Sequence, residues 1–207
     1  MNNLINNLIK EGYLKTDLVI DAFSEINRVE FLPEELEEEF LADVALPIGH
    51  GQTISQPKTV AIMLELLDPC RGQNILDVGS GSGWTTALLC YIAGHEGKVT
   101  AIERIEGLME WGKGNVSKYK NYVKNGEEGI AEFYLADGKK GFPKNAPYDR
   151  ILVNASAKVI PEDLKSQLKI GGKMVIPVRN NLIYLEKKSE NNFYKEEYPG
   201  FNFVALM

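Results

Sequence analysis

Three glycines alternate with small residues directly after a short apolar segment. The run reads Ile75-Leu76-Asp77-Val78-Gly79-Ser80-Gly81-Ser82-Gly83-Trp84-Thr85-Thr86. Glycine allows a tight backbone turn and lets a ligand approach main-chain N–H groups, and the helix predicted to follow points its partly positive N-terminus at that ligand. These residues therefore predict a binding site for a nucleotide-type cofactor.

The spacing of the glycines distinguishes between cofactors. A dinucleotide fingerprint would need its third glycine at position 84, where the chain has Trp84, and no lysine follows as in a phosphate-binding P-loop. Residues 99–103 predict the next strand, which ends in Glu103, and a carboxylate there can accept both hydroxyls of a ribose. This combination predicts S-adenosylmethionine. The alternatives are a simple turn in another doubly wound domain and, for Glu103, a solvated strand end.

The elements that must position these residues form an α/β pattern. From Asn74 onward strands and helices alternate, which is typical of a doubly wound, mostly parallel sheet covered on both faces. The predicted strands are residues 74–78, 99–103, 130–135, 149–154 and 173–178, and the predicted helices are residues 85–93, 107–124 and 161–168. In the tail, residues 182–186 and 201–206 predict an antiparallel pair at the sheet edge.

Residues 1–73 predict a helical extension before this core. One apolar stripe consists of Leu4, Ile5, Leu8 and Ile9 and ends at Gly12, and a second consists of Leu18, Ala22 and Ile26 after a capping Thr16. Residues 33–41 predict a third helix, with a proline in its first turn and glutamates that form a solvated face. We expect one domain over residues 1–207, with residues 74–207 as its cofactor-binding core.

Composition excludes several classes of protein. The net charge of −6 argues against a sequence-independent grip on nucleic acid, because affinity for phosphates comes mainly from clustered Lys and Arg. Cys70 and Cys90 are too few for a disulfide framework or a metal cluster, so we expect reduced thiols and no metal. The start of the chain lacks a signal-peptide pattern, and no apolar run approaches the ~20 residues that span a bilayer. A cytoplasmic protein without membrane contact is expected.

A polar, glycine-flanked stretch precedes the glycine loop and reads Leu46-Pro47-Ile48-Gly49-His50-Gly51-Gln52-Thr53-Ile54-Ser55-Gln56-Pro57. Together with the loop at 75–86, the pair Asp137-Gly138, residues 146–153 and residues 167–178, it resembles the protein-L-isoaspartate O-methyltransferase family. The resemblance covers nearly the whole chain. Its most specific part is the stretch from 51 to 57, on which the substrate class rests.

The resemblance implies a class I S-adenosylmethionine-dependent methyltransferase fold of Rossmann-like type. It implies a monomeric repair enzyme that methylates the α-carboxylate of L-isoaspartyl residues in damaged proteins and releases S-adenosyl-L-homocysteine. In matching positions, Ser55 would be the active-site serine, and Thr53, Ile54 and Val204 would contact the peptide, with Pro177 shaping its groove. The cofactor would be held by Gly79, Ser80, Gly81, Gly83, Glu103, Asp137 and Gly138.

The chemistry of such a transfer needs little acid or base catalysis. A carboxylate with a pKa near ~4 is ionised at neutral pH and is already a nucleophile. Ser55 would therefore orient it by a hydrogen bond. Alternatives stay open: Ser55 is also a good helix N-cap, Asp137-Gly138 a simple turn, the acceptor an aspartate in a modified peptide, or the chain a silent cofactor-binding module. We expect Trp84 to pack beneath the loop.

Four positions depart from the family pattern: Ala136, Asn154, Ser156 and Ala205. Ala205 replaces a proline in a tail that stops at Met207, so we expect a shortened cover over the substrate.

Overall fold

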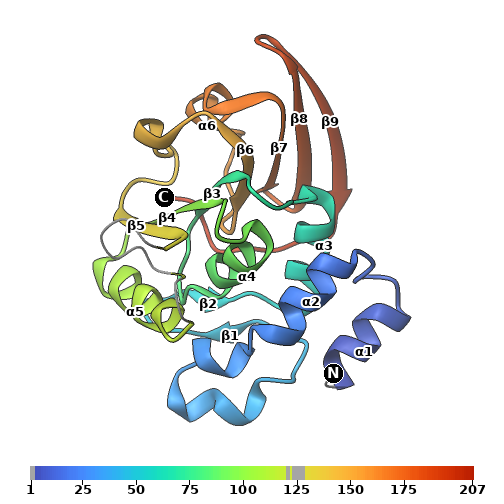
Figure 1. Cartoon of the computed structure of the whole chain (residues 1–207), viewed down its shortest axis with the longest axis vertical. Helices are drawn as coiled ribbons and strands as arrows, with labels where there is room; N and C mark the ends of the chain where they lie inside the picture. The colour runs from blue at the N-terminus through green and yellow to red at the C-terminus, as the bar shows by residue number, and fades with distance from the viewer. Residues whose placement is uncertain (1–2, 120–121, 123–128) are drawn as a thin grey trace.

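The computed structural model describes residues 3–119, 122 and 129–207, and its central feature is a seven-stranded sheet (Figure 1). The strands lie in the order β5-β4-β3-β6-β7-β8-β9. The first five of these pair in parallel: β5 (Ala131–Leu135), β4 (Lys98–Glu103), β3 (Asn74–Val78), β6 (Tyr148–Val153) and β7 (Leu168–Val178). The antiparallel edge consists of β8 (Asn181–Ser189) and β9 (Asn192–Pro199). The predicted mostly parallel sheet with an antiparallel edge is confirmed.

Side chains that alternate along the strands form two hydrophobic cores, one on each face of the sheet. In β3, Ile75 belongs to one core, whereas Leu76 and Val78 belong to the other. The first core contains α1 (Asn3–Lys10), α2 (Asp17–Glu25), α3 (Pro57–Leu67), α4 (Trp84–Ala93) and α5 (Glu106–Ser117). The second contains Leu164 of α6 (Glu162–Ser166) and Leu206 of the C-terminal segment. The N-terminal helices thus cover the same face as α4 and α5 (Figure 1).

Three predicted boundaries are wrong in the second half of the chain. The helix predicted over 161–168 is only Glu162–Ser166, and β7 begins already at Leu168 rather than at 173. Leu168 is 1% exposed and pairs with Tyr148 across a register shift, so packing extends the strand beyond its apolar run. The helix predicted over 107–124 is observed as Glu106–Ser117, and 120, 121, 123 and 124 lie outside the described residues.

The second tail strand was predicted in the wrong place. It is β9 (Asn192–Pro199), none of whose residues is fully buried, and residues 201–206 form only an isolated bridge from Ala205 to Ser156. The apolar residues of this last segment pack against the two cores instead of pairing in the sheet. Ser156 holds the segment, because its N–H donates to the Val204 carbonyl (2.7 Å) and its carbonyl accepts from Leu206 (2.8 Å).

The helical extension is confirmed, with two local corrections. Thr16 occupies the N-cap position of α2, but its hydroxyl donates to Glu65 Oε2 (2.8 Å) and makes no cap hydrogen bond. The helix predicted over 33–41 is the 3-10 helix η2 (Glu34–Glu39) with Pro33 at its N-cap, and none of its residues is buried. Two further 3-10 helices are η1 (Arg28–Phe31) and η3 (Pro143–Asn145), and a short hairpin pairs β1 (Leu46–Pro47) with β2 (Thr53–Ile54). Within the described ranges, no helix combines the length and apolarity needed to cross a membrane.

Candidate active site

The glycine loop connects β3 to α4 at the carboxyl end of the parallel strands. Gly79, Gly81 and Gly83 all adopt positive φ values, of 76°, 51° and 88°. Gly83 is the N-cap of α4, and a Cβ there would lie 2.6 Å from the Gly112 carbonyl oxygen and 2.8 Å from Val116 Cγ2. Its lack of a side chain therefore lets the loop approach α5 closely, while the turn requires the left-handed backbone.

Asp77 lies beneath this loop and was not identified as a site residue from the sequence. Its carboxylate is fully buried and accepts hydrogen bonds from Thr85 Oγ1 (3.0 Å), Thr86 Oγ1 (2.6 Å) and Asn154 Nδ2 (2.7 Å). Burial raises the pKa of Asp77 to about 6, although the three hydrogen bonds oppose the shift. A lone acid inside the apolar strand Asn74–Val78 was the signal that could have revealed it.

Glu103 closes the other side of the loop. Its Oε2 accepts from the Gly81 N–H (3.2 Å), and its Oε1 accepts from the N–H groups of Arg104 (2.7 Å) and Ile105 (3.0 Å). The residue is only 7% exposed, so the alternative of a solvated strand end is wrong. A buried carboxylate held at both oxygens by backbone donors is fixed in place and can accept further hydroxyl groups.

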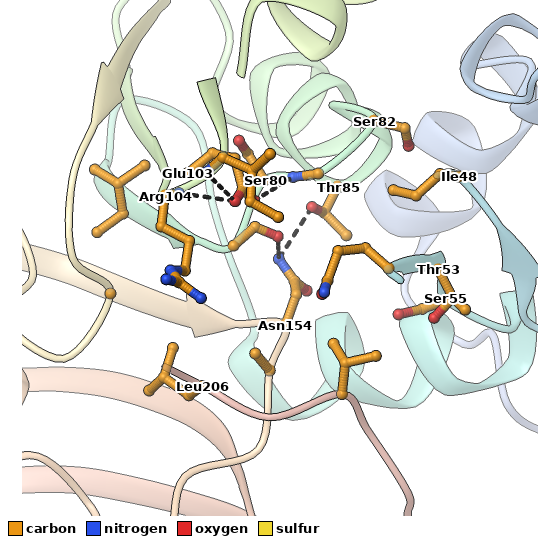
Figure 2. A pocket seen from close by; sticks show the side chains of 18 of the residues that line it. Ile48, Thr53, Ser55, Ser80, Ser82, Thr85, Glu103, Arg104, Asn154 and Leu206 are labelled. Carbon is orange, nitrogen blue, oxygen red and sulfur yellow. Dashed lines mark hydrogen bonds between the residues drawn. The ribbon is translucent and has the colours of Figure 1, made fainter. Parts of the chain in front are cut away.

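These residues border a pocket between the glycine loop, the end of β4, the β1–β2 hairpin and the C-terminal segment (Figure 2). Figure 2 shows Glu103 and Arg104 on one side, Ser55 and Thr53 on the opposite side, and Asn154 between them. The predicted site residues that line this pocket are Thr53, Ile54, Ser55, Gly79, Ser80, Gly81, Glu103, Gly138 and Val204. The pocket therefore brings most of the predicted site together.

Three predicted site residues lie outside the lining of this pocket. Gly83 sits behind the loop against α5. Asp137 is exposed in an adjoining depression beside Arg104 and Met207, where its Oδ1 accepts from the Lys139 N–H (2.9 Å). Pro177 is buried in β7, where its carbonyl accepts from the Ala157 N–H (2.9 Å).

Ser55 is not the N-cap of α3, because that position belongs to Gln56 and the helix begins at Pro57. The capping alternative is therefore wrong. Within the described part of the chain, the Ser55 hydroxyl has no hydrogen-bond partner, and its carbonyl accepts from Arg28 Nη2 (3.3 Å). The hydroxyl is thus available to a bound molecule.

Arg28 is a second residue that sequence reasoning missed. It is 4% exposed, and besides Ser55 its guanidinium donates to the carbonyls of Phe40 (3.4 Å), Ala42 (3.0 Å) and Val44 (2.8 Å). Burial lowers its pKa to about 10, against the opposing charge of Asp43. The Arg28 guanidinium therefore fixes residues 40–44, which precede the hairpin, close to the backbone of Ser55.

Trp84 packs beneath the loop as expected. It is 3% exposed, lies edge-on to Phe23 (5.7 Å between ring centroids) and has Arg28 over its ring (5.4 Å). Arg28 thus touches both the start of α4 and the Ser55 carbonyl, which connects the two halves of the pocket.

A groove runs away from the pocket between α3 and the C-terminal segment. Thr53, Ser55, Asn154 and Val204 line both the pocket and the groove. Ser55 therefore stands where a small enclosed ligand and an extended external one would meet. This arrangement can bring a group on a bound polypeptide to a nucleoside-type cofactor.

Comparison with known proteins agrees with this geometry. The family profile of protein-L-isoaspartate(D-aspartate) O-methyltransferase matches residues 1–207. A protein-L-isoaspartate O-methyltransferase of Methanopyrus kandleri is 41% identical over 208 residues, which are 99% of this chain and 89% of the relative. One of Ignicoccus hospitalis is 45% identical over 210 residues, which are 99% of this chain and 95% of the relative.

Solved structures give the same result. A protein-L-isoaspartate O-methyltransferase of Plasmodium falciparum in complex with S-adenosyl-L-homocysteine superposes with a TM-score of 0.85 at 25% identity, covering 100% of this chain and 99% of that one. A second structure of the same name has a TM-score of 0.84 at 27% identity, covering 98% of this chain and 64% of that one. The chain therefore belongs to the protein-L-isoaspartate O-methyltransferase family.

Proposed function

We propose that this chain transfers the methyl group of S-adenosylmethionine to the α-carboxylate of L-isoaspartyl residues in damaged proteins and peptides. The observation that carries the proposal is the position of Ser55, at the junction between the enclosed pocket and the open groove. Family membership supports the reaction and the cofactor. The roles of individual residues rest on the geometry of the pocket.

The residues that line the pocket fit the chemistry of the cofactor. Glu103 would accept the two ribose hydroxyls, because its oxygens are already fixed by three backbone donors. Gly79, Ser80, Gly81 and Gly83 would hold the methionine part, and the buried Ser80 hydroxyl has no partner within the described residues. A Cβ on Gly81 would come within 3.3 Å of Ile48 Cδ1, so glycine keeps this wall open. When bound, S-adenosylmethionine supplies a methyl group already activated by its sulfonium charge.

The adenine would lie beyond the ribose. Gly138 lines the pocket there, and a Cβ on it would clash with Leu206 Cδ1 at 2.7 Å and Val78 Cγ1 at 2.8 Å. Asp137 is exposed in the adjoining depression, from which its carboxylate would face an amino group of the base. These two roles follow from the matching positions in the family.

The residues on the acceptor side orient a carboxylate instead of activating it. The Ser55 hydroxyl would donate a hydrogen bond to one carboxylate oxygen and leave the other to attack. Val204 and the C-terminal segment would shield the reacting atoms from water. Holding the carboxylate oxygen, the methyl carbon and the sulfur in line can lower the activation free energy by several kcal/mol. Thr53 and Ile54 would contact the peptide chain, and Pro177 would support the groove from β7. The backbone amide nitrogen that follows would then attack the resulting ester, forming a succinimide and releasing methanol, and hydrolysis of the succinimide would give partly aspartate.

We propose further that residues 1–207 form one methyltransferase domain, with residues 1–73 as a helical extension that carries the substrate loop and residues 74–207 as the cofactor-binding core. The two hydrophobic cores support this division, because the extension packs on one face of the sheet. We also propose that the protein acts as a cytoplasmic monomer.

A pair of peptides that differ only in one residue tests the substrate class. One carries L-isoaspartate and the other L-aspartate at the same position. Methyl transfer to each peptide is measured, and binding of S-adenosyl-L-homocysteine to the protein is measured separately. The proposal expects transfer to the isoaspartyl peptide alone. Transfer mainly to the aspartyl peptide would favour a carboxylate methyltransferase for aspartate, and binding without transfer to either would favour a silent cofactor-binding module.

A further inference from the structure

The groove beyond Ser55 has one charged side chain among the described residues that line it. The lining residues are Ala45, Thr53, Ser55, Gln56, Lys58, Thr59, Ile62, Asn154 and the run from Pro199 to Val204. Lys58 is therefore the single charge on a surface otherwise made of apolar and neutral polar groups. The whole chain carries a net charge of −6, so this local positive charge is not a consequence of overall composition.

Among the residues that the structure describes, the ammonium group of Lys58 has no anionic partner. No carboxylate in the described part of the chain lies within 4.0 Å of Nζ, which instead sits 4.5 Å from the centre of the Tyr13 ring. The nearby acid Asp43 is occupied with other donors, because its Oδ1 accepts from the Lys58 backbone N–H (2.8 Å) and its Oδ2 from Gln56 Nε2 (3.1 Å). An aromatic face holds a cation without neutralising it, so the charge stays available to a ligand.

Lys58 also has a fixed relation to the reaction centre. It lies in the first turn of α3, three residues after Ser55, and its backbone is tied to Asp43. A peptide whose isoaspartyl carboxylate reaches Ser55 would therefore run past a cation on its way out of the pocket.

We propose that Lys58 is a specificity-determining residue that binds a second carboxylate of the substrate, on a residue flanking the damaged one. The preferred substrates are then peptides with an Asp or Glu side chain close to the isoaspartyl residue. The inference rests on the proposed function, because it takes the groove as the peptide site. An exposed ion pair of this kind gives a preference of about threefold, which falls as salt is added.

Four isoaspartyl peptides, blocked at both ends, test the proposal. Two carry Glu and two carry Gln, placed either before or after the isoaspartyl residue, and the readout is the ratio of kcat/KM within each Glu/Gln pair. Wild-type protein is compared with Lys58→Met, with Lys58→Arg, which keeps the charge, and with Lys98→Met as a control. Lys98 is an exposed lysine at the start of β4, outside the groove.

The proposal expects a preference for Glu of about threefold at one of the two positions in wild-type protein, in Lys58→Arg and in Lys98→Met. Lys58→Met should reduce that ratio to about one. An unchanged ratio in Lys58→Met, or no preference in wild-type protein at either position, would overturn it. Failure of wild-type protein to methylate any of the four peptides would instead contradict the proposed function.

Discussion

Among the described residues, the Ser55 hydroxyl has no hydrogen-bond partner, so it is available to a substrate. The cap position of α3 is taken by Gln56, and Arg28 holds the Ser55 carbonyl. The Ser55 side chain therefore does not cap the helix, and its backbone is fixed by Arg28, so the hydroxyl can donate a hydrogen bond to a substrate. Gln56 occupies the N-cap position and leaves the adjacent Ser55 to position the substrate.

Replacing Ser55→Ala should therefore affect transfer more than binding of cofactor. A hydrogen bond to a charged group contributes roughly 1.5–3 kcal/mol, so we expect kcat/KM for an isoaspartyl peptide to fall by about 10- to 100-fold. The dissociation constant for S-adenosyl-L-homocysteine should stay close to that of wild type, as titration calorimetry would measure. Ser117→Ala, which removes an exposed hydroxyl on α5, is the matched control. Equal activity of Ser55→Ala and Ser117→Ala would contradict the role of Ser55.

Asp77 should make folding stability depend on pH in an unusual direction. Its pKa is raised from 3.8 to about 6, chiefly by burial, so the folded state holds the proton more tightly than the unfolded state. The free energy of unfolding contributed by this group therefore falls as pH rises through the window from about 4 to about 6, by about 3 kcal/mol in all.

Urea unfolding of wild-type protein and Asp77→Asn at a series of pH values measures this contribution. Because the other carboxylates are common to both proteins, the difference in unfolding free energy between them should shift by about 2.4 kcal/mol in favour of the variant from pH 4 to pH 7. Parallel curves for the two proteins across that window would show that Asp77 is not perturbed.

At the scale of elements, the glycine loop and α5 form one unit. Gly83 and Gly112 approach each other so closely that a Cβ on either would meet backbone of the other segment. The loop therefore keeps its shape because a helix packs against it, and α5 in turn follows the strand that ends in Glu103.

A pair of glycine substitutions tests this packing with opposite signs. Gly83→Ala places a Cβ 2.6 Å from the Gly112 carbonyl oxygen at a φ of 88°, so we expect a loss of about 2 kcal/mol or more in the free energy of unfolding. Gly114→Ala lies in the same helix α5 with nothing within 4 Å of its Cβ, so better helix propensity should add about 0.5–1 kcal/mol. A gain in Tm for both variants in thermal unfolding would contradict the close approach.

The parallel strands β3, β4 and β5 could be predicted from the sequence to within a residue, and the antiparallel edge strand β9 could not. β3 and β4 could be predicted because each has a short, mostly apolar run, which is typical of a strand buried on both faces. β9 was missed because it has no apolar run: its residues are mainly aromatic and charged, and none of them is fully buried. The apolar segment after it was mistaken for a strand because its hydrophobic residues pack on the cores and not in the sheet.

The same distinction applies to the site. The glycine loop and Glu103 were predicted from their spacing, and Ser55 from the resemblance of residues 51–57 to the family. Asp77 and Asn154 meet across a sequence separation of 77 residues, and Arg28 reaches carbonyls up to 27 residues away. The partners in such contacts are distant in the sequence, so a local sequence pattern does not predict which residues will meet.

At the scale of the whole molecule, the fold places the enclosed pocket and the open groove side by side, with Ser55 in the lining of both. The carboxyl ends of the parallel strands supply the cofactor pocket, the helical extension supplies Ser55, and the C-terminal segment crosses between them and borders both. A crossing segment held through Ser156 can shield the junction while leaving the groove open to a polypeptide. The molecule as a whole thus favours a large acceptor over a small free one.

The most direct measurement is transfer of a labelled methyl group from S-adenosylmethionine to an L-isoaspartyl peptide, followed by mild base treatment of the product. We predict that the peptide becomes labelled and that base releases the label, because the product is a methyl ester of a carboxylate. A base-stable label, which would indicate methylation of nitrogen, or the absence of any transfer would contradict the account.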